Sequence, residues 1–365
     1  MVIPFVCIGG LFFLYMQDIK FHIIVYYIAG GFSFASFVAC FIIKPRLQDA
    51  REEMMAEQVA KGKGIRYKNM SKEERQKADL MRAMKNESLL SSVEYKNILK
   101  QGSKDPEEDL KNLIGLHAVK ESVLRYQAQL ENKSLDYGSK HMCFLGNPGT
   151  GKTTVAGIIT GFFYQYKYIK KNEYIAIDGN FLKSSEDPIG RTNLLLQKAK
   201  GKVLLIDEAY SLVQGNSGIG QQILATIINE MENNRDKMII ILSGYKKEMR
   251  ELFQANSGLA SRIKNYYIFE DYTIEEMKEI FTSLIHKQNL VVDVDALDKV
   301  AEILTRKKQL KNFANARTVR NIAEKSIAEH QYHVVRKHLA EHDRYRLLAS
   351  DILDEKEMDD YLNYF

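Results

Sequence analysis

The sequence is poor in the residues that mark several classes of protein. Its 365 residues include three cysteines and no tryptophan, and three cysteines are too few for a disulfide framework. We interpret Cys7, Cys40 and Cys143, which all lie in apolar stretches, as small apolar residues in a reducing compartment. The eight histidines show no metal-ligand spacing. The composition therefore excludes a disulfide-rich scaffold and gives no support to a zinc site.

An excess of one charge is also missing. Lys and Arg total 52 against 47 Asp and Glu, which is a formal net charge of +5. A nucleic-acid-binding domain would concentrate basic residues on one face, and the sequence shows no such stripe. We therefore expect no nucleic-acid partner.

One segment has no charge at all. Phe21–Ile43 contains no Asp, Glu, Lys or Arg, and about 23 residues with a rise of about 1.5 Å each can cross the hydrocarbon core of a bilayer. A buried helix of a soluble protein is the competing interpretation. Val2–Met16 is a shorter apolar run that fits a first span, a re-entrant segment or a signal-peptide core. We favour a hairpin and expect residues 1–43 to anchor the chain in the lipid bilayer through one or two transmembrane helices.

Basic residues follow the longer apolar run. Lys44, Arg46 and Arg51 come directly after it, and the positive-inside rule places such a flank in the cytoplasm. We therefore predict a protein of the cell membrane whose remaining chain lies in the cytoplasm. Residues 44–104 are polar and charged with a helical composition, so we interpret them as a charged helical linker. An adaptor-binding element is the alternative.

The pattern changes near Leu110. Short apolar runs now alternate with amphipathic helical stretches, which predicts an α/β core with a parallel sheet and crossover helices. The expected strands are His141–Leu145, Tyr174–Ile177, Val203–Ile206, Met238–Leu242 and Tyr266–Phe269. The expected later helices are Ile274–Leu290, Asp295–Lys308 and Ala316–His338. We therefore predict an α/β core over residues 105–272, followed by a small all-α domain and a tail over residues 273–365.

A glycine-rich segment connects the first of these strands to a helix. It reads Gly146-Asn147-Pro148-Gly149-Thr150-Gly151-Lys152-Thr153, followed by Thr154. Its glycines let backbone N–H groups turn towards phosphate oxygens, and the helix N-terminus adds a positive dipole end. We expect Lys152 to reach the β- and γ-phosphates of ATP and the Thr153 hydroxyl to ligate Mg²⁺. A chance glycine-rich turn is the competing interpretation.

Two carboxylates follow the strand expected at Val203–Ile206. Asp207 and Glu208 would lie at the carboxyl edge of the sheet, where ligands bind in folds of this type. We expect Asp207 to hold Mg²⁺ and Glu208 to polarise the attacking water as a general base. Acidic residues often end a strand, but together with the phosphate loop these two form a Walker B motif.

These motifs resemble the CbxX/CfqX, or CbbX-type, family of AAA+ proteins. That family includes red-type Rubisco activases, stage V sporulation protein K and the ATPases of type VII secretion. The matching segments are Leu113–Leu116 with Val119-Lys120, His141–Ala156, Asp207–Tyr210, Ser243–Tyr245, Asn256–Arg262 and Asn315–Asn321. The resemblance covers about Leu110 to His330 and implies a P-loop AAA+ core with a helical lid. It also implies a homo-oligomeric ring, a hexamer in this family, that hydrolyses ATP to remodel or disassemble a protein client.

The resemblance assigns roles to three arginines. Arg262 occupies the position of an arginine finger, which enters the site of the neighbouring subunit and neutralises charge on the γ-phosphate. Arg317 resembles the sensor 2 arginine, which contacts the γ-phosphate of its own subunit. Arg320 lies one helical turn further and could share that role.

Other roles from the resemblance concern the adenine and the sensor 1 position. Ile114 and Gly115 match the segment that packs on adenine, although they also fit an ordinary core. Sensor 1 is expected at the end of the fourth strand, where Ser243 and Tyr245 both qualify.

The chain departs from the family at the segment that grips substrate. The aligned residues 187–192 read Asp-Pro-Ile-Gly-Arg-Thr, so Pro188 replaces the usual aromatic residue. Ile189 could still press on a substrate chain, but proline stiffens a loop and removes a donor. Two functions therefore stay open: a membrane-anchored ATPase that remodels a client by turnover, and an ATP-occupancy switch or scaffold of a membrane complex that threads nothing. A motor on nucleic acid is a weaker third alternative.

Overall fold

The computed structural model describes residues 11–15, 22–26, 83–132, 138–215, 218–336 and 341–354. The chain divides into two compact units, 1–88 and 89–365. In the first unit, β1 (Leu11–Tyr15) and β2 (His22–Tyr26) pair antiparallel, with Leu11 opposite Tyr26. The helical spans predicted for these segments are wrong here, because the aromatic and β-branched residues of these runs suit a strand as well as a helix.

The rest of the expected anchor lies outside the described residues, as does the expected linker up to residue 82. Over the part of the chain that the structure describes, no helix combines the length and the apolar character needed to cross a membrane.

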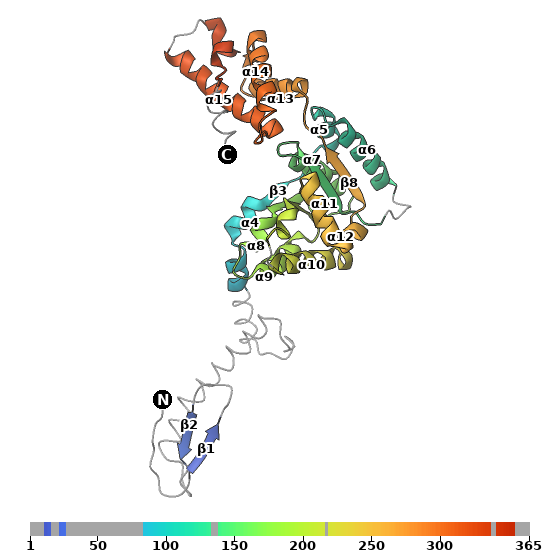
Figure 1. The fold of residues 1–365 in the computed structure, drawn as a ribbon. Coiled ribbons are helices and arrows are strands. Elements are labelled where there is room, and N and C mark those ends of the chain that lie inside the picture. Colours follow the sequence, from blue (N-terminus) through green and yellow to red (C-terminus); the bar gives the residue numbers. More distant parts are fainter. Residues whose placement is uncertain are drawn as a thin grey trace. The chain divides into compact units, whose positions relative to one another are not determined.

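A sheet forms the centre of the second unit (Figure 1). Its six strands have the order β3-β5-β6-β7-β4-β8. The strands are β3 (Leu99–Gln101), β4 (Met142–Gly146), β5 (Glu173–Asp178), β6 (Val203–Asp207), β7 (Ile239–Gly244) and β8 (Asn265–Phe269). Strands β4 to β8 pair in parallel and confirm the five predicted strands. The sheet is mixed rather than parallel, because β3 adds an antiparallel edge strand beside β5.

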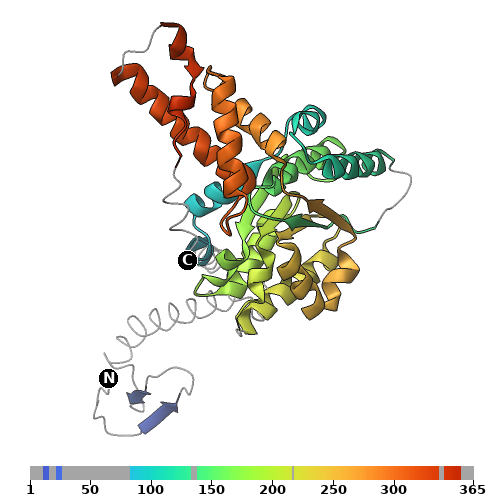
Figure 2. The same cartoon turned by 45° about the horizontal axis from the view of Figure 1, so that its top comes forward.

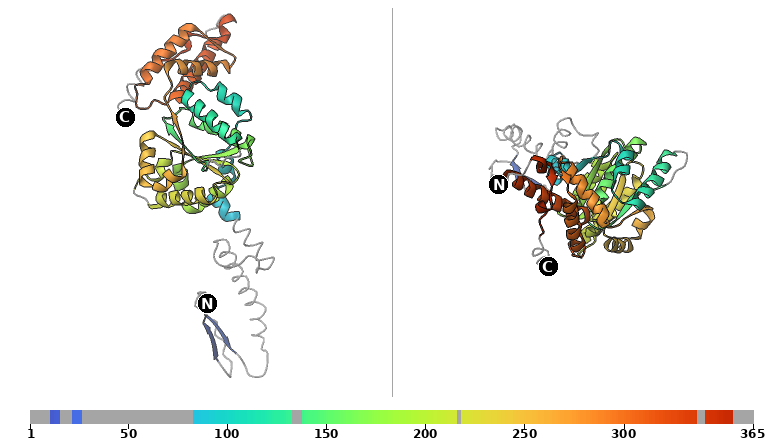
Figure 3. Two further views of the ribbon diagram at one scale, coloured as in Figure 1. Left: turned by 90° about the vertical axis from the view of Figure 1, so that its right-hand side faces the viewer. Right: turned by 90° about the horizontal axis from the view of Figure 1, so that it is seen from above.

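Helices cover both faces of this sheet (Figure 3). One face carries α5 (Pro106–Asn112), α6 (His117–Glu131) and α7 (Lys152–Gln165); the other carries α8 (Gly179–Lys183), α9 (Pro188–Ala199), α10 (Gly218–Asn233), α11 (Lys246–Ala255) and α12 (Ser257–Arg262). Successive residues of β4 alternate between these layers: Met142 and Phe144 face the first and Cys143 faces the second. Cys143 is a buried free thiol, as its apolar surroundings predict.

The core begins earlier than the sequence predicts. Helix α4 (Ser92–Ile98) and β3 fall in the segment assigned to the linker, but both belong to the second unit, which starts at Leu89. Leu89 and Leu90 are buried in the layer of α9 and α10. A capping box between Ser91 and Glu94 starts α4, since each side chain accepts a bond from the other's backbone N–H.

The α-helices described after the sheet confirm the predicted helical lid (Figure 2). They are α13 (Ile274–His286), α14 (Val294–Lys307) and α15 (Asn315–Arg336). A short parallel pair, β9 (Val291–Val292) with β10 (Arg346–Leu347), joins the start of α14 to the described end of the chain. Thr273 and Glu276 form a capping box that starts α13 directly after the core.

Candidate active site

The glycine-rich segment links the end of β4 to the start of α7, as its sequence predicts. Gly149 and Gly151 have φ angles of +70° and +93°, which glycine adopts without steric cost. Space is also limiting, because a Cβ on Gly149 would lie 2.0 Å from the carbonyl oxygen of Ala314. The backbone therefore requires glycine at both positions, and the approach of the lid leaves no room for a side chain at Gly149.

Lys152 begins α7 and is buried within the loop. Its Nζ donates to the carbonyl oxygens of Gly146, at 2.9 Å, and Asn147, at 2.8 Å. Burial lowers the pKa of Lys152, and the nearby carboxylate of Asp207 opposes that shift. Phosphate oxygens are stronger partners for an ammonium than carbonyl groups are, so this cation is placed to move onto a bound triphosphate.

The two acidic residues lie at the carboxyl end of β6. The Ser243 hydroxyl, from the end of β7, donates to Asp207 Oδ1, and the Glu208 N–H donates to the same oxygen at 3.0 Å. Glu208 has a φ of +46°, so the chain turns sharply directly after the strand. Asp207 and Thr153 line one cavity, and a carboxylate with a hydroxyl is a donor set that suits Mg²⁺.

A cavity of about 260 Å³ lies between core and lid and brings most of the predicted site together. It is lined by Pro148, Gly149, Gly151, Lys152, Thr153, Thr154, Asp207, Glu208, Tyr210, Gly244, Tyr245, Ala316, Arg317 and Arg320. The phosphate loop, both acidic residues and both lid arginines therefore face one space, although they come from the connection of β4 to α7, from the end of β6 and from α15.

The predicted adenine segment is not part of this lining. Gly115 has a φ of +60° and lies against the carboxylate of Glu276, and Ile114 beside it is half-buried. The following residue, Leu116, lies beside Gly151 of the phosphate loop. The segment is thus next to the loop and the lid, but it does not line the cavity.

Both sensor 1 candidates lie near the end of β7, but their side chains make different contacts. Ser243 contacts Asp207, as described above, whereas the ring of Tyr245 lines the cavity and stacks on Tyr210 at 5.5 Å. Burial raises the pKa of Tyr245, and the charge of Glu208 adds to the shift. Its hydroxyl therefore stays protonated at neutral pH and can donate.

Comparisons with known proteins fit this geometry. Residues 142–271 match the model of the "ATPase family associated with various cellular activities (AAA)", and residues 273–360 match the "AAA lid domain". Protein CbxX of Cupriavidus necator is 34% identical over 238 residues, which are 60% of this chain and 73% of that protein. This chain belongs to the CbbX-type family of AAA+ ATPases.

Other relatives agree with that family. Protein CbbX of Cereibacter sphaeroides is 34% identical over 62% of this chain and 77% of its own length. The chloroplastic ribulose bisphosphate carboxylase/oxygenase activase of Cyanidioschyzon merolae is 33% identical over 67% of this chain and 89% of its own length. The crystal structure of the FIGL-1 AAA domain has a TM-score of 0.52 at 17% identity, over 77% of this chain and 94% of that one, and supports the fold alone. As a member of this family, the chain is a nucleotide-binding P-loop enzyme that hydrolyses ATP.

Arg262, the AAA+ finger candidate, does not line the cavity of its own subunit. It ends α12, where Nη1 donates to the Gly258 carbonyl oxygen at 3.0 Å and Nε lies 3.3 Å from Glu232 Oε2 of α10. The structure therefore separates Arg262 from Lys152 and Arg317, which the cavity brings together.

The segment aligned with the family's pore loop is the first turn of a helix. Asp187 caps α9 by accepting from the Gly190 N–H, and Pro188 takes the first helical position. Ile189 is half-buried against the layer of α9 and α10. The segment therefore begins a helix rather than forming the expected loop, and the cap, the proline and the packing of Ile189 hold this turn in place.

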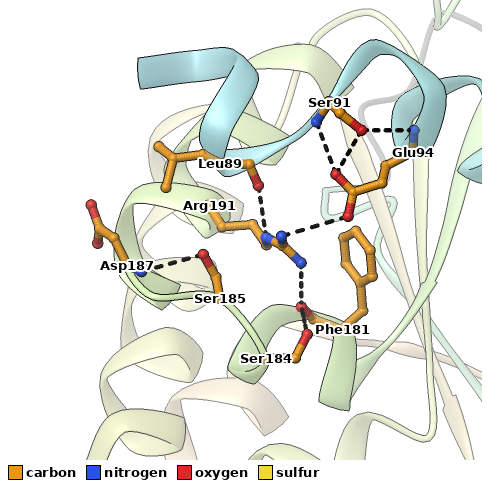
Figure 4. A network of polar contacts seen from close by, with 8 residues as sticks. All are labelled: Leu89, Ser91, Glu94, Phe181, Ser184, Ser185, Asp187 and Arg191. Atoms are coloured by element: carbon orange, nitrogen blue, oxygen red, sulfur yellow. Dashed lines mark hydrogen bonds and ion pairs between the residues drawn. The ribbon is translucent and has the colours of Figure 1, made fainter. Parts of the chain in front are cut away.

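Arg191 of the same helix is a structural residue that the sequence did not reveal (Figure 4). Its side chain donates to the carbonyl oxygens of Leu89, at 2.8 Å, and Phe181, at 3.2 Å. Its guanidinium also lies over the Phe181 ring and 3.7 Å from Glu94 Oε1. One buried cation thus joins the segment before α4 to α8 and α9.

Asn315 and Asp271 were also missed. Asn315 begins α15, is fully buried and has a φ of +46°, and its Nδ2 donates to Asp271 Oδ1 at 2.8 Å. The one sequence signal was an asparagine directly before the arginine motif of the lid, and a single asparagine at a helix start is most often a cap.

Proposed function

We propose that this AAA+ ATPase works as a ring of identical subunits that couples ATP turnover to the remodelling of a protein client. The observation that supports it is the single cavity that holds Lys152, Asp207, Glu208 and Arg317 between core and lid. A site on both sides of a hinge can convert a change in its ligand into a change of lid angle.

Each side chain has a task in hydrolysis. Lys152 leaves the loop carbonyls and binds the β- and γ-phosphates, while Arg317 contacts the γ-phosphate from the lid. Glu208 polarises the attacking water. Ser243 holds the carboxylate of Asp207, which with Thr153 would hold Mg²⁺; that ion, when bound, neutralises charge on the phosphates.

The ring supplies the remaining cation. Arg262 lies outside its own cavity, so we assign it to the site of the adjacent subunit. The family generally forms hexamers, and a finger supplied in trans makes hydrolysis depend on assembly.

The kind of client follows from the relatives. One of them is named an activase of ribulose bisphosphate carboxylase/oxygenase, and we extend the idea of a folded protein client, without its identity, to this chain. The first turn of α9 is capped and packed, so we expect Ile189 not to grip a threaded chain. An ATP-occupancy switch remains the second candidate for the same reason.

Substitution of the general base distinguishes the two. Glu208→Gln should lower ATP turnover about 10²–10⁴-fold, since this is the usual contribution of general acid–base catalysis, and should leave ATP binding intact. An ATPase that works by turnover then loses its effect on the client, whereas a switch keeps it. The exposed Glu251→Gln on α11 is the matched control and should turn over ATP like the wild type. A wild-type protein that neither binds nor cleaves ATP with Mg²⁺ would overturn the proposal.

The location in the cell is a separate proposal. It rests on the uncharged run Phe21–Ile43 and the basic residues after it, which favour attachment to the cell membrane with the ATPase in the cytoplasm. Release of the full-length chain from cell membranes by alkaline carbonate would contradict it.

A further inference from the structure

Five consecutive carbonyl groups of the phosphate loop, from Gly146 to Thr150, accept hydrogen bonds. Those of Gly146 and Asn147 accept from Lys152, as described above. The next three accept from the lid and its hinge: Pro148 from Asn315 Nδ2 at 3.2 Å, Gly149 from the Ala316 N–H at 3.2 Å, and Thr150 from the Tyr272 hydroxyl at 3.5 Å. The lid and its hinge therefore determine the orientation of the peptide groups that follow Pro148, Gly149 and Thr150.

Because each peptide group is planar, these hydrogen bonds also fix the direction of the N–H groups. In a trans peptide the carbonyl of one residue and the N–H of the next point in opposite directions. The bond from Asn315 to Pro148 thus turns the Gly149 N–H away from Asn315, and the bond from Ala316 does the same for the Thr150 N–H. Backbone N–H groups in such a loop are the donors that bind phosphate.

Asn315 is built into this position from several sides. Its Nδ2 also donates to Asp271 Oδ1, and its Oδ1 accepts from the Tyr272 N–H at 3.1 Å. Asp271 in turn accepts from Asn147 Nδ2 at 3.0 Å. Asn315 has a positive φ, a conformation that asparagine adopts more readily than most residues. Its side chain also offers both a hydrogen-bond donor and an acceptor.

We propose that Asn315 is a positioning residue for the phosphate cradle: it latches the first turn of α15 to the phosphate loop and turns the loop's N–H groups for the triphosphate. The inference rests on the proposed nucleotide site and adds a residue to it. Because the latch acts before the nucleotide arrives, it contributes equally to ground-state and transition-state binding. Its loss raises KM and Kd and leaves kcat unchanged.

The test compares two variants of the full-length protein with one control. Asn315→Gly removes the amide without strain at positive φ, and Asn315→Asp keeps the shape but replaces the donor by an acceptor. Asn321→Asp makes the same chemical change at an exposed position of α15. Kd for ADP and ATP, KM, kcat and the unfolding temperature are measured for each.

We expect Asn315→Gly to raise both Kd values about tenfold, which corresponds to one or two lost hydrogen bonds, with kcat within twofold of wild type. Asn315→Asp should lose more, since its carboxylate would face that of Asp271 and the Pro148 oxygen. Asn321→Asp should bind like wild type. In a double-mutant cycle, adding Asp271→Ala to Asn315→Gly should cost less than the two single changes together.

Two results overturn the latch. One is an Asn315→Gly protein that binds ADP and ATP within twofold of wild type. The other is a loss of kcat in proportion to a fall in unfolding temperature, at unchanged Kd, which would show a merely structural role. Both differ from failure of the proposed function, in which the wild-type protein itself does not bind ATP.

Discussion

His141 lies next to the strand that precedes the phosphate loop. Both hydrogen bonds of its side chain require a neutral imidazole ring. It is 1% exposed; its Nδ1 accepts from the Ile240 N–H and its Nε2 donates to the Met231 carbonyl, both at 3.0 Å. A proton on Nδ1 would remove its acceptor and leave the Ile240 N–H without a partner. Burial lowers the pKa of His141, and the charge of Lys140 adds to the shift.

The shift predicts a stability that falls in mild acid. The unfolded chain binds a proton at His141 below a pKa of about 6.5, whereas the folded chain binds it only at lower pH. The contribution of the neutral His141 to the free energy of unfolding is therefore present at neutral pH and declines as pH falls. Between about pH 7.5 and about pH 5.5 the loss is at most about 1.4 kcal/mol. Denaturant unfolding at both pH values measures it.

The comparison with variants isolates this residue from other titrating groups. His141→Gln should be less stable at neutral pH but should show a smaller decline between the two pH values. His117→Gln, at an exposed position of α6, should decline like the wild type. An equal decline in the wild type and in His141→Gln would contradict the assignment.

At the scale of elements, the hydrogen bonds of Arg191 help to hold α4 and β3 on the edge of the sheet. Arg191→Met keeps the apolar stem but leaves the carbonyl oxygens of Leu89 and Phe181 without their donor. We expect a loss of about 2–4 kcal/mol, because buried polar groups are left unsatisfied. Hydrogen exchange should show the loss first in Ser92–Gln101.

A matched variant separates this effect from a general loss of charge. Arg250→Met, at an exposed position of α11, should change stability by less than about 0.5 kcal/mol. Unchanged protection of α4 and β3 in Arg191→Met would show that the edge is held by its strand pairing alone.

These elements also show what the sequence could predict. The parallel strands and the lid helices follow from apolar runs and helical periodicity, and the phosphate loop and Asp207-Glu208 follow from local motifs. Strand β3 was missed because three residues are too few to show a pattern. The start of α9 carries a local signal, Asp187 before Pro188, which is typical of a helix N-terminus, whereas the resemblance to a pore loop predicts a loop at this position.

The bonds of Asn315 and Arg191 are of a different kind. Two of them join residues more than 100 positions apart along the chain: Arg191 with Leu89, and Asn315 with Pro148. No periodicity or spacing encodes such a pair, so only the folded structure reveals it.

At the scale of the whole molecule, the position of Arg262 predicts that one subunit completes the site of another. Arg262→Ala should bind ATP like wild type but lose about 10³–10⁵ in turnover, since fingers contribute that much. Arg250→Ala is the control for charge and should stay active. Lys152→Ala should lose turnover by failing to hold the triphosphate.

Mixing the two inactive proteins decides where the finger acts. In a mixed ring, a Lys152→Ala subunit still offers Arg262 to the intact cavity of an Arg262→Ala neighbour, so we expect turnover to return with a maximum at intermediate ratios. Sedimentation in the presence of ATP confirms that the two proteins assemble together. If mixed assemblies form and remain as inactive as either protein alone, Arg262 acts within its own subunit, and its distance from the cavity must then close by movement of α12.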